Sequence, residues 1–239
     1  MTDPLQTAIA EARVEMLSRL EQFALHPRGV LDLGGAVSES HPNVLPQRFP
    51  KARIVLSSNA ATAGTLGRSP ATVAVGAATA TFGARLHQWW QRALHRGKSL
   101  SKRAGTARLE RIVAAPTALP LTDGSMDLVL GHWLMPGADT LDAVLVEIRR
   151  CLAPGGLFLW TSAGPLNGES PIPEALDMHD LGSALTRAGF LEPVLDVDRY
   201  PGAHCEVIHA AAFAGESGRA TANEVVIPLD ALRRRGAHR

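Results

Sequence analysis

Short apolar runs that alternate with helix-like segments constrain the fold of this 239-residue chain more than any other feature. Each run is rich in Val, Ile and Leu and is bounded by glycine, proline or polar residues, as is typical of a buried parallel strand. Strands that alternate with helices predict an α/β domain with a doubly wound, parallel sheet and right-handed crossovers. The runs expected to form strands are GVLDLGG (29–35), ARIVLSS (52–58), ERIVAA (110–115), MDLVLGH (126–132) and GLFLWTSAG (156–164).

Three segments have apolar residues at helical spacing along one face, which predicts amphipathic helices. They cover about 5–25, 141–152 and 177–190. Two further apolar segments, 193–200 and 205–213, are expected to be closing strands, because a Pro-Gly pair between them is typical of a tight turn.

The composition divides the chain into three parts: a leading helix (1–28), an α/β domain (29–213) and a C-terminal tail (214–239) that holds one short apolar run, EVVIPL. Within the domain, the segment 85–111 contains eight Lys and Arg residues against one Glu. Such a segment is either a solvated helix and loop or a contact surface for an acidic partner.

Net charge and cysteine content exclude several classes of protein. The 24 Lys and Arg against 23 Asp and Glu leave a net charge of +1, so we expect no binding to nucleic acid or membranes driven by overall charge. No apolar stretch approaches the length of a membrane span, and the acidic N-terminal segment is unlike a secretory signal. The only cysteines, Cys151 and Cys205, lack the spacing of a zinc site. We therefore expect a cytoplasmic protein without a metal.

Three segments resemble class I S-adenosylmethionine-dependent methyltransferases. VLDLGG (30–35) is similar to their first strand and loop, LPLTDGSMDLVLGHWLM (119–135) to their fourth strand with its approach, and EIRRCLAPGGLFLWTSAGP (147–165) to their fifth strand. The distal segments DMHDLGSALTRAGFLEPVLDVDRY (177–200), EVIHAAAFAG (206–215) and EVVIPLDALRRR (224–235) resemble the malonyl-ACP O-methyltransferases of the biotin pathway, commonly called BioC. The DMHDLG segment is also similar to one in a group of mitochondrial complex I assembly factors.

This resemblance implies a seven-stranded, mostly parallel, Rossmann-like sheet whose last strand, about 205–213, is antiparallel. It also implies an activity: methyl transfer from S-adenosylmethionine to the free carboxylate of a malonyl thioester on acyl carrier protein. The basic segment 85–111 could face that acidic carrier. Whether the protein forms a homo- or hetero-oligomer stays open.

In the resembling family, the cofactor lies beyond the carboxyl ends of the strands, above a G-x-G-x-G loop. The aligned residues here run from Gly34 through Gly35 and Ala36 to Ser38, so only the first glycine is in register. The acidic residue that accepts both ribose hydroxyls at the end of the second strand aligns with Ser58. The aspartate that meets the adenine amino group aligns with Ala115.

Two more residues are candidates for this cofactor site. Asp32 lies where the family has an acidic residue before the glycine loop, and its role is either to serve the cofactor or to hydrogen-bond within the loop. His132 follows the fourth strand, where it either lines the pocket or is a satisfied buried polar residue. No residue is assigned a catalytic role. The losses at the cofactor motifs leave a second function open, a non-catalytic scaffold that pairs with an active partner.

Overall fold

The computed structural model describes residues 3–58 and 107–215. Most of the basic segment 85–111 and the apolar run EVVIPL lie outside the described residues. The division of the chain into a helix, a domain and a tail stays a prediction.

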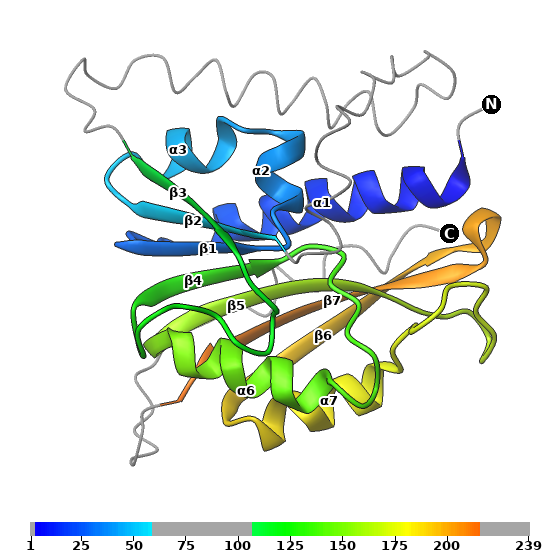
Figure 1. The fold of residues 1–239 in the computed structure, drawn as a ribbon. Helices are drawn as coiled ribbons and strands as arrows, with labels where there is room; N and C mark the ends of the chain where they lie inside the picture. Colours follow the sequence, from blue (N-terminus) through cyan, green and yellow to red (C-terminus); the bar gives the residue numbers. More distant parts are fainter. Residues whose placement is uncertain (1–2, 59–106, 216–239) are drawn as a thin grey trace.

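The described residues form one seven-stranded sheet with the order β3-β2-β1-β4-β5-β7-β6 (Figure 1). Among these strands only β7 is antiparallel to its neighbours, β5 and β6. The prediction of a mostly parallel, doubly wound sheet with an antiparallel last strand is therefore confirmed. The strands are β1 (Gly29–Leu33), β2 (Arg53–Ser58), β3 (Arg108–Val113), β4 (Met126–Gly131), β5 (Leu152–Pro165), β6 (Phe190–Tyr200) and β7 (Cys205–Ala214).

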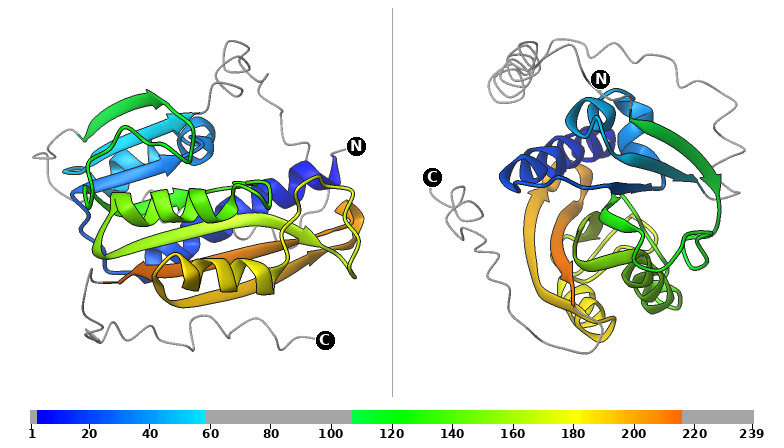
Figure 2. Two further views of the ribbon diagram at one scale, coloured as in Figure 1. Left: turned by 60° about the horizontal axis from the view of Figure 1, so that its bottom comes forward. Right: turned by 90° about the vertical axis from the view of Figure 1, so that its left-hand side faces the viewer.

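Helices cover both faces of the sheet. Figures 1 and 2 show α1 (Pro4–Gln22), α2 (Ala36–Ser40) and α3 (Val44–Arg48) on one face, and α6 (Leu141–Cys151) and α7 (Met178–Arg187) on the other. Every residue of β1 is buried, as expected for a strand that has helices on both sides. The sequence did not predict α2 and α3, because five-residue helices are too short to show a helical period.

The first helix packs lengthwise on its face of the sheet. Asp3 caps its N-terminus by accepting a hydrogen bond from the backbone N–H of Leu5. Ala8 and Ala12 are fully buried in a cluster with Val207 of β7. Farther along, buried apolar residues of α1 join a second cluster with β1 and α2, consisting of Met16, Leu17, Leu20, Val30 and Val37 among others. This packing holds α1 against the sheet from β7 to β1.

Several strands differ from their predicted bounds, and β3, β5 and β6 each start two or more residues earlier than predicted. β5 spans Leu152–Pro165 instead of 156–164, because Leu152 at its start pairs with Met126 of β4 and Pro165 at its end pairs with Cys205 of β7. β3 spans Arg108–Val113 instead of 110–115. Ala115 therefore lies in the loop after β3 and not in the strand.

Candidate cofactor site

The sequence-predicted site residues follow the carboxyl ends of four neighbouring parallel strands. In the register of the sheet, Leu33 of β1 pairs with Ser57 of β2, and Ser58 pairs with Val113 of β3. On the other side, Asp32 of β1 pairs with Leu130 of β4. The residues that follow these strands therefore share one edge of the sheet, where α/β proteins of this topology bind ligands. They are Gly34, Gly35, Ala36, Ser58, Ala115 and His132.

The loop after β1 has the backbone geometry that the glycines predict. Gly34 and Gly35 both have positive φ angles, of 87° and 68°, and Gly35 precedes the first residue of α2. Its N–H donates to the carbonyl of Asp32 at 3.2 Å. A Cβ built on Gly34 would meet no atom of residues 3–58 and 107–215 within 4 Å, so these residues leave open space above that α-carbon. The loop can accept a close ligand there, although a side chain would be strained by the left-handed backbone.

Asp32 stabilises the glycine loop through a hydrogen bond to the helix that follows it. Its carboxylate is completely buried, and Oδ2 accepts a hydrogen bond of 2.7 Å from the backbone N–H of Ser38 in α2. This contact ties the end of β1 to the helix that follows the glycine loop. Of the two roles left open by the sequence, hydrogen bonding within the loop is observed, and a role toward a cofactor stays a prediction.

The ends of β2 and β3 carry no charged side chain. Ser58 is partly exposed, and its carbonyl accepts a hydrogen bond of 2.9 Å from the N–H of Ala114. Ala115 is exposed, and its carbonyl accepts a bond of 3.0 Å from Ala118. At the described end of β2, Ser58 is thus the partly exposed hydroxyl, and the hydroxyl-bearing Ser57 beside it is buried.

The loop after β3 is fixed by an ion pair that the sequence reasoning missed. Glu147 of α6 accepts a hydrogen bond of 2.6 Å from the N–H of Leu119. Arg150, one turn further along α6, donates to the carbonyls of Leu119 (3.0 Å) and Leu121 (2.7 Å) and to Glu147 itself. The hydrogen bond from Arg150 lowers the pKa of Glu147 below its ordinary value. The i, i+3 spacing of Glu147 and Arg150 predicts that the two side chains pair, but nothing in the sequence predicts their hydrogen bonds to the loop after β3.

His132 lies in a buried polar layer beneath α1. Its ring is 2% exposed, and Nδ1 lies 2.9 Å from Oγ1 of Thr161 in β5. The same oxygen accepts a bond of 3.0 Å from the N–H of Trp133, whose φ is 52°. Burial, reinforced by the positive charge of Arg13 and by the nearby His209, lowers the pKa of His132 to about 3. The imidazole is therefore neutral near pH 7.

Known proteins point to one superfamily. A family described as "Methyltransferase domain" matches residues 87–160. The malonyl-[acyl-carrier protein] O-methyltransferase of Methylovorus sp. strain MP688 is 30% identical over 80% of this chain and 59% of its own length. The corresponding protein of Laribacter hongkongensis is 36% identical over 42% of this chain and 41% of its own length. A solved Burkholderia thailandensis 1,6-didemethyltoxoflavin-N1-methyltransferase with bound S-adenosylhomocysteine has a TM-score of 0.52 at 16% identity, covering 87% of this chain and 79% of that one. The fold is that of class I methyltransferases, and the sequence is similar to the malonyl-[acyl-carrier protein] O-methyltransferases among them.

This methyltransferase-type chain spans only about half of the length of the relatives it matches in sequence. The likeness to the solved structure shows the fold alone. Within residues 3–58 and 107–215, each helix is too short or too polar to cross a bilayer. In the same part of the chain, no group of three or more His, Cys, Asp or Glu side chains could hold a metal ion.

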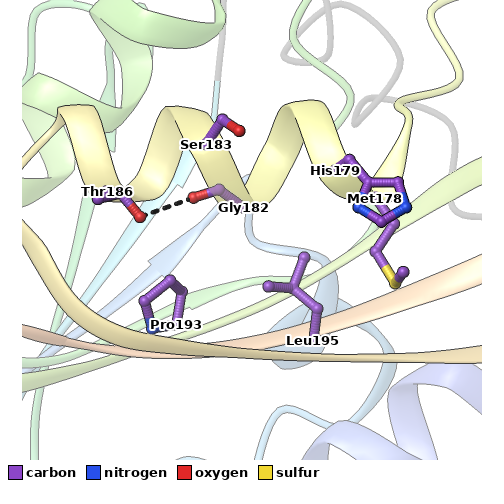
Figure 3. Close-up of a pocket in the computed structure, with 7 residues that line it drawn as sticks. All are labelled: Met178, His179, Gly182, Ser183, Thr186, Pro193 and Leu195. Atoms are coloured by element: carbon purple, nitrogen blue, oxygen red, sulfur yellow. Dashed lines mark hydrogen bonds between the residues drawn. The ribbon is translucent and has the colours of Figure 1, made fainter.

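A cavity of about 450 Å³ lies elsewhere in this methyltransferase fold, between α7 and β6 (Figure 3). β6 is the edge strand farthest from β3, so this cavity is separate from the carboxyl ends of β1 to β4. It is lined by Met178, His179, Gly182, Ser183, Thr186, Pro193 and Leu195.

Proposed function

We propose that the protein transfers a methyl group from S-adenosylmethionine to the free carboxylate of a malonyl thioester carried by acyl carrier protein. The single observation that carries the proposal is the glycine loop, left-handed at Gly34 and Gly35 and open above Gly34, at the carboxyl end of β1. The sequence similarity to malonyl-[acyl-carrier protein] O-methyltransferases supports the choice of acceptor.

The residues present fit the cofactor in part. The backbone of Gly34 would lie against its amino-acid and ribose portions, because a Cβ built there meets no atom of the described residues within 4 Å. Ser58 would offer one hydroxyl to the ribose where a carboxylate could take two hydroxyl donors. The loop at Ala115, held by Glu147 and Arg150, would form the adenine side of the site.

Methyl transfer to a carboxylate requires little acid or base catalysis from the protein. S-adenosylmethionine supplies a methyl group activated by its sulfonium; the bond from carboxylate oxygen to methyl forms as the bond from sulfur to methyl breaks. The acceptor carboxylate is already ionised near pH 7, so no proton has to be removed. The protein's contribution is to bind, orient and shield the two reactants. A buried, neutral His132 is compatible with this requirement.

Acyl carrier protein is the proposed partner, and the basic segment 85–111 is its proposed contact. In the described part of that segment, Arg108 and Arg111 are exposed on the edge strand β3. A basic surface on this edge strand would attract an acidic carrier.

A non-catalytic scaffold is the second candidate function. It is favoured by the absence of a carboxylate at the end of β2, where Ser58 stands, since one lost charged contact weakens binding by about 10- to 100-fold.

Calorimetric titration of the full chain with S-adenosylhomocysteine separates the two functions. The methyltransferase proposal predicts saturable binding with one site per chain. A folded protein that releases no binding heat at any workable concentration, and gains no thermal stability from the ligand, would favour the scaffold.

A further inference from the structure

One row of α1 faces the carboxyl ends of β1 and β4. Residues four apart lie above one another on a helix, so Ile9, Arg13 and Leu17 form one row. Leu17 belongs to the same buried apolar cluster as Val37, which lies just beyond the glycine loop. The backbone of Ile9 lies beside the imidazole of His132, close enough to favour its protonated form. Arg13, between these two contacts, is therefore directed toward the edge of the sheet that holds the proposed cofactor site.

Arg13 differs from the other well-packed arginine of this helix. Its Nε is buried and has no hydrogen-bond partner among the described residues. Arg19, by contrast, donates to Glu15 at 3.3 Å and to Asp196 of β6 at 2.8 Å. A half-buried guanidinium without such bonds keeps its N–H donors available for a ligand. The planar arrangement of these donors matches the two oxygens of a carboxylate.

The charges around Arg13 favour an anion beside it. Burial lowers the pKa of its guanidinium, while the nearby carboxylate of Asp32 raises it, so the group stays ionised near pH 7. Arg13 in turn disfavours a second positive charge on His132. Since the guanidinium is already half-buried, part of the cost of removing it from water has been met before a carboxylate binds to it.

We propose that Arg13 is a ligand-binding residue that holds a carboxylate at the carboxyl ends of β1 and β4. This inference rests on the proposed function, which brings two carboxylates to this edge: that of the cofactor's amino-acid portion and that of the malonyl acceptor. Both present the same chemistry to a guanidinium, and the binding experiment distinguishes them.

The test compares Arg13→Gln with the unchanged full chain, using S-adenosylhomocysteine, 5′-methylthioadenosine, which lacks the amino-acid carboxylate, and malonyl-coenzyme A as probes. If Arg13 holds the cofactor, the variant loses about 10- to 100-fold in affinity for S-adenosylhomocysteine and keeps its affinity for methylthioadenosine. If Arg13 holds the acceptor, both nucleoside affinities stay and binding of malonyl-coenzyme A falls by a similar factor. Arg13→Lys should restore part of the lost affinity in either case, because lysine keeps the positive charge but lacks the paired N–H donors of the guanidinium.

Arg19→Gln is the matched control on the same helix. It removes the contacts to Glu15 and Asp196, so it should lower stability while leaving the affinity ratio of the two nucleosides unchanged. Equal losses for both nucleosides in Arg13→Gln, or unchanged binding of all three probes, would overturn the proposal. If the unchanged protein binds neither nucleoside, the proposed function fails separately, and malonyl-coenzyme A alone then decides the role of Arg13.

Discussion

Replacing Ser58 by aspartate should raise the affinity for S-adenosylhomocysteine. The register of the sheet fixes Ser58 at the end of β2, beside the loop that follows β1. A carboxylate there can accept from both ribose hydroxyls, whereas the serine hydroxyl satisfies them only in part. One additional charge-assisted hydrogen bond contributes about 1.5–3 kcal/mol. The expected gain is therefore about 10- to 100-fold in the dissociation constant.

Calorimetry on the Ser58→Asp, Ser58→Asn and unchanged proteins measures this gain. The asparagine variant is the matched control, because it has nearly the same shape but only one acceptor oxygen and no charge. Ser58 is partly exposed, so the aspartate should cost little stability in the free protein. Unchanged affinity in Ser58→Asp, together with a clear loss of unfolding free energy, would refute the reasoning and mean that the site has closed around a buried charge.

Two further predictions concern the packing around the site. Arg150→Ala should lower the free energy of unfolding in urea by about 2–4 kcal/mol, because it leaves the largely buried carboxylate of Glu147 without its ion-pair partner. Arg187→Ala is the control: it breaks an exposed ion pair and should cost less than about 1 kcal/mol. Similar costs for the two variants would contradict the role of Arg150 in fixing the loop. Because the folded-state pKa of His132 is lowered to about 3, only the unfolded chain takes up this proton as the pH falls below about 6.5, so stability is lost in that range by up to about 1.4 kcal/mol per pH unit. His132→Gln should remove this part of the pH dependence, and parallel stability profiles for the variant and the unchanged protein between pH 7 and 5 would disprove it.

The strands were predictable because burial on both faces leaves a nearly continuous apolar run in each. β1 and β4 end within two residues of their predicted limits for this reason. The length of β5 was not predictable in the same way. Pro154, Gly155 and Gly156 are typical of a turn, but the strand starts before them because Leu152 pairs with Met126 of β4. Long-range partners, and not local preference, set that boundary.

The position of the candidate site was predictable, and the environment of its side chains was not. Parallel strands bring their carboxyl ends to one edge, so Ser58 and Gly34 had to lie near each other. The burial of His132 depends on α1, which is more than a hundred residues away in the sequence. Arg13 was missed for the same reason, since a lone arginine in an amphipathic helix gives no signal of what it faces.

Methyl transfer itself tests the central claim most directly. The measurement is mass spectrometry of malonyl-acyl carrier protein incubated with S-adenosylmethionine and the full chain. The proposed function predicts that the carrier gains the mass of one methyl group on its malonyl carboxylate, and that carrier loaded with an acetyl group gains none. A folded protein that leaves malonyl-acyl carrier protein unchanged under conditions where S-adenosylmethionine saturates it would contradict the claim.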